Sequence, residues 1–421
     1  MNNLDQYLKN IVTYVYNNVK SYREKMLNAG IKPDDIQGIE NMDLLPYMDK
    51  EDFRKNYPYG LFAVPLDKII RVHSTSGTTT GMPSIVGFTE KDWNLQKKMT
   101  SKIAELAGIT TKDIVQIVYG FGMFTGGIGW LEGLENINAL VIPSGSGNSQ
   151  KQIEYMKNLK TTTLIGTPSY IMYLSELASQ LNVKKSELNV KNILVGGEIM
   201  NEEVRKIIKD LWKTESVTQN YGFCEGGGAG ISGECIYQSG LHISPYYYPE
   251  VIDPQTLKRL PLGSTGELVF TTFHKEGLPL IRYRTHDIAT LTFEKCQCGI
   301  EGYKMSRIIG RTDEMLKIKG VCVYPSVIES LFLNNEICTP NYEMVLTTHN
   351  YLDDFAIRIE LKEPLSSYSY DYLLQVKGSL QQNIKNKIGI NIDIEFVNPN
   401  TLDRYEGKSH KVKDLRLSRS R

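Results

Sequence analysis

The amino-acid sequence predicts an α/β protein with a large domain of βαβ units, an antiparallel subdomain, and a small α+β domain at its end. Three observations predict this class. From about residue 71, short apolar and β-rich runs alternate with helical stretches, as in βαβ units. Two further β-rich runs, 266–272 and 289–293, are typical of antiparallel pairing. After about residue 312, the tail has a strand and helix pattern of its own.

The predicted elements follow in order along the chain. Residues 4–29 carry apolar side chains at helical spacing and predict one amphipathic helix. The strands predicted for the βαβ part are Ile114–Tyr119, Ala139–Pro143, Thr163–Gly166 and Asn192–Val195, and the helices are 150–160, 169–181 and 201–212. In the tail we predict helices near 325–333 and 368–387, and strands near 342–347, 355–361 and 391–396. Ligands bind at the carboxyl ends of the strands in sheets of this kind.

Composition and charge limit the classes of function. The chain of 421 residues carries 48 Lys and Arg against 48 Asp and Glu, which argues against a nucleic-acid binder and against a polybasic membrane binder. No stretch is apolar enough to span a membrane, and the N-terminus lacks a signal-peptide pattern. We therefore expect a soluble, cytoplasmic protein. Its six cysteines are too few for a disulfide scaffold, so free thiols or a metal site are expected.

A segment rich in glycine and hydroxyl residues, His73–Pro83, lies between two β-rich runs. Backbone N–H groups and hydroxyls at this density suit phosphate oxygens, although the Gly-Lys-Ser/Thr ending of a Walker A loop is missing. A flexible surface linker is the alternative. The apolar runs Ile69–Val72 and Ile85–Phe88 favour a loop held between two strands. The candidate phosphate contacts are Ser74, Ser76, Gly77, Thr78, Thr79 and Gly81.

This segment resembles the phosphate-binding loop of adenylate-forming enzymes, the acyl-CoA synthetase or AMP-binding superfamily. Its flanks, 71–73 and 86–89, resemble the phenylacetate–coenzyme A ligase branch in particular. Here one more Thr than usual is present in the loop, and Met82 stands where many relatives have Lys. The resemblance implies an N-terminal adenylation domain over residues 1–312 and a small, mobile C-terminal lid domain over residues 313–421.

Two further blocks resemble the acyl and adenine sites of the family. The segment 119–129 looks like the block beside the acyl pocket, where Tyr119, Phe121 and Phe124 would clamp a flat apolar substrate. A core strand followed by a turn explains these aromatic residues almost equally well. The segment Gly196-Gly197-Glu198 is similar to the adenine-binding turn, which implies nucleotide contacts for Gly197 and Glu198.

The segment Tyr221-Gly222-Phe-Cys-Glu225 looks like the block in which a Tyr ring stacks on adenine and a Glu holds Mg²⁺. The resemblance implies that Tyr221 and Gly222 contact the nucleotide and that Glu225 is a catalytic magnesium ligand, since Mg²⁺ needs oxygen ligands. Cys224 replaces the usual hydroxyl of this block. A solvated loop acid is the alternative for Glu225.

The last blocks resemble the ribose contact and the junction between the domains. The segment 282–287 resembles the block whose Asp accepts hydrogen bonds from the ribose hydroxyls, a role that Asp287 suits because it offers two acceptor oxygens. The segment 310–313 is similar to the block in which Arg311 contacts the nucleotide and Asp313 is the hinge. For each Asp, a simple turn residue is the alternative.

The segment 405–408 resembles the C-terminal block that carries the catalytic Lys. The ammonium of Lys408 would stabilise the negative charge that develops between the carboxylate and the α-phosphate. An exposed Lys in a basic tail is the alternative interpretation.

A separate group of residues predicts a metal site. Cys296 and Cys298 form a tight pair, and Cys235 lies shortly before His242. Three cysteines and one histidine are a common tetrahedral set for structural zinc. The spacing is not that of a zinc finger, but similar positions recur in the ligase branch named above. We therefore predict a structural Zn²⁺, with four residues in unrelated loops as the alternative.

The resemblance implies ATP-dependent activation of an aromatic, phenylacetate-like carboxylic acid. An acyl-adenylate would form with Mg²⁺, and coenzyme A would then take the acyl group, with release of AMP and pyrophosphate. One alternative is transfer to a carrier-protein thiol or to another acceptor instead of coenzyme A. A non-catalytic nucleotide-binding relative is a second alternative, and a homodimer is a further expectation.

Overall fold

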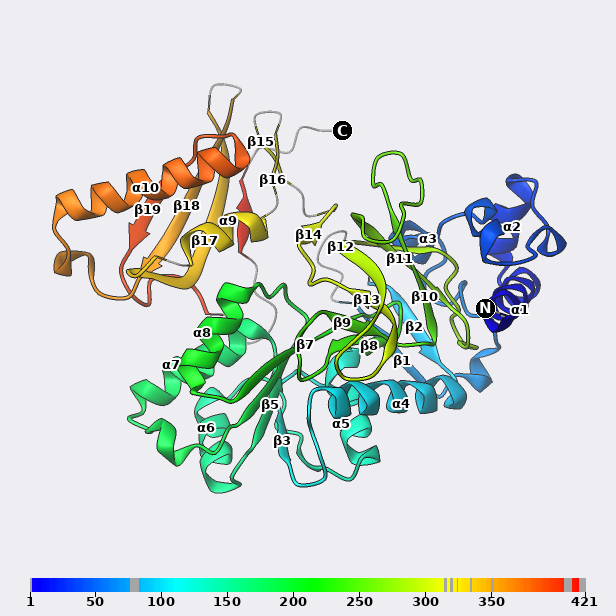
Figure 1. The fold of residues 1–421 in the computed structure, drawn as a ribbon, viewed down its shortest axis with the longest axis horizontal. Coiled ribbons are helices and arrows are strands. Elements are labelled where there is room, and N and C mark those ends of the chain that lie inside the picture. The colour runs from blue at the N-terminus through cyan, green and yellow to red at the C-terminus, as the bar shows by residue number, and fades with distance from the viewer. Residues whose placement is uncertain are drawn as a thin grey trace.

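The protein folds into a large domain with a smaller domain beside it, as Figure 1 shows for this computed structural model. The structure describes residues 2–75, 83–313, 316–318, 321–323, 325–333, 335–349, 352–404 and 411–415. The predicted site residues outside these ranges are Ser76, Gly77, Thr78, Thr79, Gly81 and Lys408.

Residues 4–29, predicted as one helix, form two helices. α1 (Asn2–Asn18) and α2 (Lys20–Asn28) are separated at Val19, where the backbone is extended, with φ −112° and ψ 97°. The prediction of a single helix was wrong because the apolar spacing continues across the break. Val19 is buried in the same core as Tyr22, so the periodicity of the sequence does not change there.

Short helices and a two-stranded sheet follow α2. Their bounds are η1 (Pro33–Asp35), η2 (Ile39–Leu44), α3 (Lys50–Lys55), η3 (Leu66–Lys68), β1 (Arg71–Ser74), β2 (Ile85–Phe88) and α4 (Glu90–Leu106). The Asp49 carboxylate caps α3 by accepting from the backbone N–H of Glu51 and Asp52. The Thr89 side chain caps α4 in the same way, so both helices begin where the sequence offers a cap.

One end of the main sheet is parallel and confirms the predicted βαβ units. Its strands, in spatial order, are β4 (Leu140–Ile142), β3 (Ile114–Ile117), β5 (Thr163–Gly166), β6 (Asn192–Val195) and β7 (Ser216–Phe223). The helices along this part of the chain are α5 (Thr125–Asn136), α6 (Ser149–Asn158), α7 (Pro168–Gln180) and α8 (Glu202–Trp212). β5 is buried along its whole length, as expected for a parallel strand covered on both faces.

The same sheet continues beyond β7 with antiparallel strands, which confirms the predicted antiparallel subdomain. These are β8 (Gly228–Glu234), β9 (Leu241–Ile243), β10 (Tyr247–Ile252), β11 (Thr265–Thr272), β12 (Tyr283–Lys295), β13 (Glu301–Met305) and β14 (Gly310–Arg311). Outward from β7 the order is β8, β9, β13, β12, β11 and β10. β12 pairs with β11, β13 and β14 along its length. It therefore connects Asp287 and Arg311, two of the predicted nucleotide contacts, to the rest of the sheet.

The small domain has its own sheet, with α10 against it (orange and red in Figure 1). Its elements are β15 (Leu316–Ile318), β16 (Val321–Val323), α9 (Pro325–Phe332), β17 (Cys338–His349), β18 (Leu352–Leu361), η5 (Leu365–Ser367), α10 (Tyr370–Ile388), β19 (Asp393–Val397) and β20 (Val412–Asp414). The sheet order is β19-β18-β17-β20, which confirms the predicted α+β character. An ion pair between Arg404 and Glu176 of α7, 3.7 Å long, ties this domain to the large one.

The domain boundary predicted between residues 312 and 313 stays a prediction. Within the described part of the chain, no helix combines the length and the apolar character that a membrane span requires.

Candidate active site

The ends of the predicted phosphate loop are held together by the first hairpin. β1 and β2 are antiparallel, with Ser74 opposite Ile85, which confirms the loop between two strands. Thr75 N–H donates to the Ser84 carbonyl oxygen at 3.1 Å, and Ser84 N–H donates to Thr75 Oγ1 at 2.9 Å. The two described ends of the loop therefore lie side by side, with Ser74 at one of them.

Glu225 lies next to the foot of this loop, directly after β7. The Ser84 hydroxyl donates to Glu225 Oε1 at 3.1 Å, and the Glu225 residue is only 4% exposed. Burial, and then the charge of Glu225 beside it, raise the pKa of the Tyr283 phenol. Glu225 is thus a buried carboxylate among hydroxyl groups, and the solvated loop acid of the alternative interpretation does not describe it.

Lys275 is a buried cation near Glu225 that the sequence analysis missed. Its residue is 5% exposed, and its Nζ has no hydrogen-bond partner among the residues the structure describes. The ammonium lies over the Phe88 ring, 4.9 Å from the centroid. Burial lowers the pKa of Lys275 to about 8, against the opposing effect of Asp92 and Glu225. No motif marks this Lys, because its burial depends on strands far away in the sequence.

Tyr221, Asp287, Arg311 and Asp313 form one hydrogen-bonded set. The Tyr221 hydroxyl donates to Asp287 Oδ2 at 2.7 Å, and Arg311 Nη1 donates to Asp287 Oδ1. Arg311 Nε also donates to Asp313 Oδ1 at 2.8 Å. β14 pairs with β12 so that Asp287 stands opposite Arg311, which explains how blocks apart in the sequence meet.

Lys50 of α3 joins this set from the N-terminal region. Its Nζ lies 3.0 Å from Asp313 Oδ2. Burial acts to raise the pKa of Asp313, but Arg311 and then Lys50 lower it, to about 2. Lys50 was missed by the sequence analysis because the contact spans the whole large domain.

The predicted acyl-pocket residues are only partly brought together. A cavity of about 40 Å³ lies beside β7, and its lining residues are Tyr119, Phe124, Thr125, Gly126, Trp130, Gly197, Asn220, Gly222, Phe223, Cys224, Gly228 and Ala229. Phe121 is not among them and packs against the neighbouring core. The Thr125 Oγ1 lies 3.4 Å from the Cys224 Sγ.

The two glycines of the predicted nucleotide contacts have steric reasons to be glycine. A Cβ on Gly222 would lie 1.9 Å from the Gly228 carbonyl oxygen, so no larger residue fits. Gly197 has φ +79°, a conformation that side chains rarely adopt. Glu198, next to it, accepts from the Ser169 backbone N–H at 3.1 Å and from the Ser169 hydroxyl at 2.8 Å, at the start of α7.

The four residues of the predicted zinc site converge. All the ligand atoms of Cys235, His242, Cys296 and Cys298 lie within 4.8 Å of one another. The Cys235 and Cys296 Sγ atoms are 3.7 Å apart, and Cys298 Sγ lies 3.4 Å from His242 Nε2. The β8–β9 and β12–β13 hairpins meet where β9 pairs with β13, and this pairing brings the two halves together.

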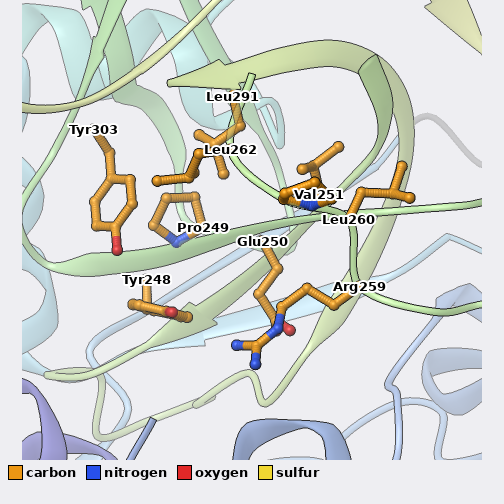
Figure 2. A pocket seen from close by; sticks show the side chains of 10 residues that line it. Tyr248, Pro249, Glu250, Val251, Arg259, Leu260, Leu262, Leu291 and Tyr303 are labelled. Carbon is orange, nitrogen blue, oxygen red and sulfur yellow. The ribbon is translucent and has the colours of Figure 1, made fainter. Parts of the chain in front are cut away.

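A larger cavity, of about 220 Å³, lies among β10, β12 and β13 (Figure 2). None of the predicted site residues lines it, and its charged groups have partners elsewhere. Glu250 pairs with Arg282 at 2.8 Å, and Arg259 pairs with Asp43 at 3.2 Å. Aromatic and aliphatic side chains, including Tyr248 and Tyr303, form most of the remaining wall.

Comparison with known families decides the family of this chain. The model described as "AMP-binding enzyme" matches residues 28–274, and "AMP-binding enzyme C-terminal domain" matches residues 320–416. The chain belongs to the AMP-binding enzyme family. It is 35% identical to a phenylacetate-coenzyme A ligase of Thermus thermophilus, over 98% of this chain and 96% of that protein. It is 36% identical to one of Escherichia coli, over 98% and 94% of the two chains.

A solved structure shares the fold over nearly the whole chain. A 2-hydroxyisobutyryl-CoA ligase in the postadenylation state, in complex with R3-HIB-AMP, superposes with a TM-score of 0.90 at 24% identity, over 98% of this chain and 88% of that one. The same ligase in the thioesterification state gives 0.70 at 25% identity, over 99% and 89%. This AMP-binding enzyme therefore superposes better on the postadenylation structure than on the other.

Proposed function

We propose that this protein is an AMP-forming acid–CoA ligase that acts on an aromatic, phenylacetate-like carboxylic acid. ATP and the acid form an acyl-adenylate and pyrophosphate, and coenzyme A then takes the acyl group and releases AMP. The observation that carries this proposal is the similarity to phenylacetate-coenzyme A ligases over nearly the full length of both chains. The convergence of the Tyr221, Asp287 and Arg311 blocks supports it.

The proposed roles follow from the chemistry of the groups. Asp287 accepts from the ribose hydroxyls, because its two oxygens match a vicinal diol. Arg311 contacts the nucleotide, and the Tyr221 ring packs against adenine. Glu225 holds Mg²⁺ next to the phosphates, a role that fits a buried carboxylate beside the Ser84 hydroxyl. Lys408 stabilises the charge that develops at the α-phosphate, and the small domain turns about Asp313 between the two steps.

Zinc is the proposed resident metal. Three thiolates and one imidazole are soft ligands that suit Zn²⁺, and their convergence around one point supports a closed structural site. We further propose a cytoplasmic enzyme that works without a nucleic-acid or membrane partner. The homodimer stays a prediction, and transfer to a carrier-protein thiol stays the alternative to coenzyme A.

The decisive experiment measures both half-reactions of the purified protein. Pyrophosphate release is followed with ATP, Mg²⁺ and single acids from an aryl, an indolyl and an aliphatic series, and free coenzyme A thiol is then measured. We expect pyrophosphate with an aryl acid and stoichiometric loss of coenzyme A thiol. Pyrophosphate release without thiol loss would favour a carrier-protein acceptor. No pyrophosphate with any acid would contradict the ligase assignment.

A further inference from the structure

Trp130 lines the small cavity beside β7 and carries a buried hydrogen-bond donor on its indole ring. It lies in α5, is 0% exposed, and lines the cavity together with Tyr119 and Phe124. The indole Nε1–H has no acceptor among the residues that the structure describes. Buried N–H donors almost always have a partner, because an unmade hydrogen bond in the interior is unfavourable. An acceptor atom on a molecule that enters the cavity would supply the missing partner.

The other polar groups of the lining already have partners. Asn220 Nδ2 donates to the Val195 carbonyl oxygen at 2.9 Å. The Thr125 hydroxyl is paired with the Cys224 thiol. The indole N–H of Trp130 differs from these groups because it has no partner among the described residues.

The size of the cavity limits what can enter. Its volume of about 40 Å³ is far below the several hundred Å³ of a typical ligand pocket. The large Trp130 ring is fixed in the core between α5 and the sheet, whereas Phe124 is 48% exposed and has room to move outward. A ligand can therefore gain space on the Phe124 side but not on the Trp130 side.

We propose that Trp130 determines which acid this enzyme accepts: its ring limits the acyl group to one compact ring, and its N–H donates to an acceptor atom on that group. The acid class is a single-ring arylacetate with a ring nitrogen, hydroxyl or carbonyl. This inference rests on the proposed function, because it takes the cavity as the acyl site. An acid without an acceptor leaves the N–H unpaired, and sites built to hydrogen-bond a substrate reject such analogues strongly.

The test compares acids that have the same shape. The values of kcat/KM are measured by pyrophosphate release for phenylacetate, the three pyridylacetates and the three hydroxyphenylacetates. We expect at least one acceptor-bearing acid to exceed phenylacetate by about tenfold or more. Equal values for all acids would overturn this inference but leave the ligase function standing. Failure of every acid would instead count against the ligase function.

Variants then assign the preference to the indole N–H. Trp130→Phe keeps an aromatic ring without the donor, so the preference for acceptor-bearing acids over phenylacetate should fall to within about twofold. Trp212→Phe is the control, since the Trp212 N–H donates to the Ile171 carbonyl oxygen outside the cavity. Trp130→Ala should in addition admit larger acids such as indoleacetate. A preference that survives in Trp130→Phe would overturn the proposal, whether or not Trp130→Ala folds.

Discussion

Two groups of residues come together from distant parts of the sequence: the proposed nucleotide region (Tyr221, Asp287 and Arg311) and the Cys/His cluster (Cys235, His242, Cys296 and Cys298). The two groups differ in the kinds of atoms that face one another. In the first region, Tyr221, Asp287 and Arg311 pair donors with acceptors and positive with negative charge. In the second, three sulfur atoms and one imidazole nitrogen, each of which could donate an electron pair to a metal, lie within 4.8 Å of one another. In the first region, the donors and acceptors named above are paired with one another. In the second, a cation at the centre would give the sulfur and nitrogen lone pairs a common partner.

This difference fits the two proposed roles, a site for a substrate and a site for a resident ion. Ribose hydroxyls would replace partners that Asp287 already has, so binding is an exchange and its net free energy is modest. A zinc ion would instead replace close contacts between thiol groups with metal–ligand bonds, and its binding free energy would become part of the folding free energy. The two regions should therefore respond differently to substitution: the first in kinetics, the second in stability.

The largest effect is expected from Lys408→Ala, which tests whether the nucleotide region can form the adenylate without the ammonium charge of Lys408. Adenylate formation should fall at least about a hundredfold, because one preorganised charge contact in the transition state is worth roughly 3 kcal/mol. Thiolysis of supplied acyl-adenylate should stay largely intact. Single-turnover assays of each half-reaction measure this. Lys413→Ala is the control, since Lys413 pairs with Glu343 in the small domain. Equal loss in both half-reactions would contradict the role.

The next largest effect is expected from Asp287→Ala, which tests whether ribose hydroxyls replace the present hydrogen-bond partners of Asp287. The KM for ATP should rise by about tenfold or more with little change in kcat, because ribose contacts act alike in the ground and transition states. Tyr221→Phe is the matched variant: it removes the hydroxyl that donates to Asp287 but keeps the ring. It should change the KM by less than about threefold. An unchanged KM for ATP in Asp287→Ala would remove this residue from the nucleotide site.

Cys296→Ser should act on the other region and change stability more than turnover. The purified wild-type protein should carry about one zinc per chain, and the variant should lose most of it and melt at a lower temperature, since it loses a ligand of a structural site. Activity should fall less than about tenfold at low temperature. Elemental analysis and thermal melting measure these effects.

Cys338→Ser is the matched control, because Cys338 is a buried free cysteine in the small domain, outside the cluster. It should keep its zinc even if its melting temperature falls. Wild-type protein that holds no zinc after purification without chelators would contradict the metal site.

The sequence predicted the fold class and several strands well because both have local signals, and the proposed nucleotide residues were likewise chosen from local blocks. The strands Thr163–Gly166 and Asn192–Val195 were predicted with their exact bounds, because a short apolar, β-rich run in an α/β chain usually forms a buried strand. Tyr221, Asp287 and Arg311 each sit in a block whose residue types carry the chemistry. β20 was missed because its three residues, Val412–Asp414, include charged side chains and give no periodic pattern.

The residues that were missed depend on contacts between distant segments. Lys275 is an ordinary Lys in the sequence, and only its position over Phe88 shows that it is buried. The indole N–H of Trp130, which has no acceptor among the described residues, likewise has no local signal in the sequence. Phe121, an aromatic residue in the same block as Tyr119 and Phe124, packs against the neighbouring core and does not line the small cavity, so its proposed substrate contact stays a prediction.

The smallest effect is expected from Lys50→Met, which removes the ion pair between Lys50 of α3 and Asp313. The Lys50–Asp313 pair is partly exposed, so its loss should change the free energy of unfolding by less than about 1 kcal/mol. Because Asp313 is the proposed hinge, the ratio of the two half-reactions should still shift, by about two- to fivefold away from adenylation. Single-turnover rates for each half-reaction measure this shift.

The charge of Asp313 defines the conditions under which the Lys50 test is valid. Its pKa of about 2 lies below that of an ordinary Asp, so its ion pairs contribute fully above about pH 4 and are lost as the pH falls toward 2. At neutral pH, Asp313 is ionised in both proteins, and any shift reports the missing ammonium. Lys55→Met is the control, because Lys55 lies on the same helix, 4.0 Å from Glu51 and far more exposed. An equal shift in both variants would place the effect in α3 as a whole and contradict a specific link between Lys50 and the hinge.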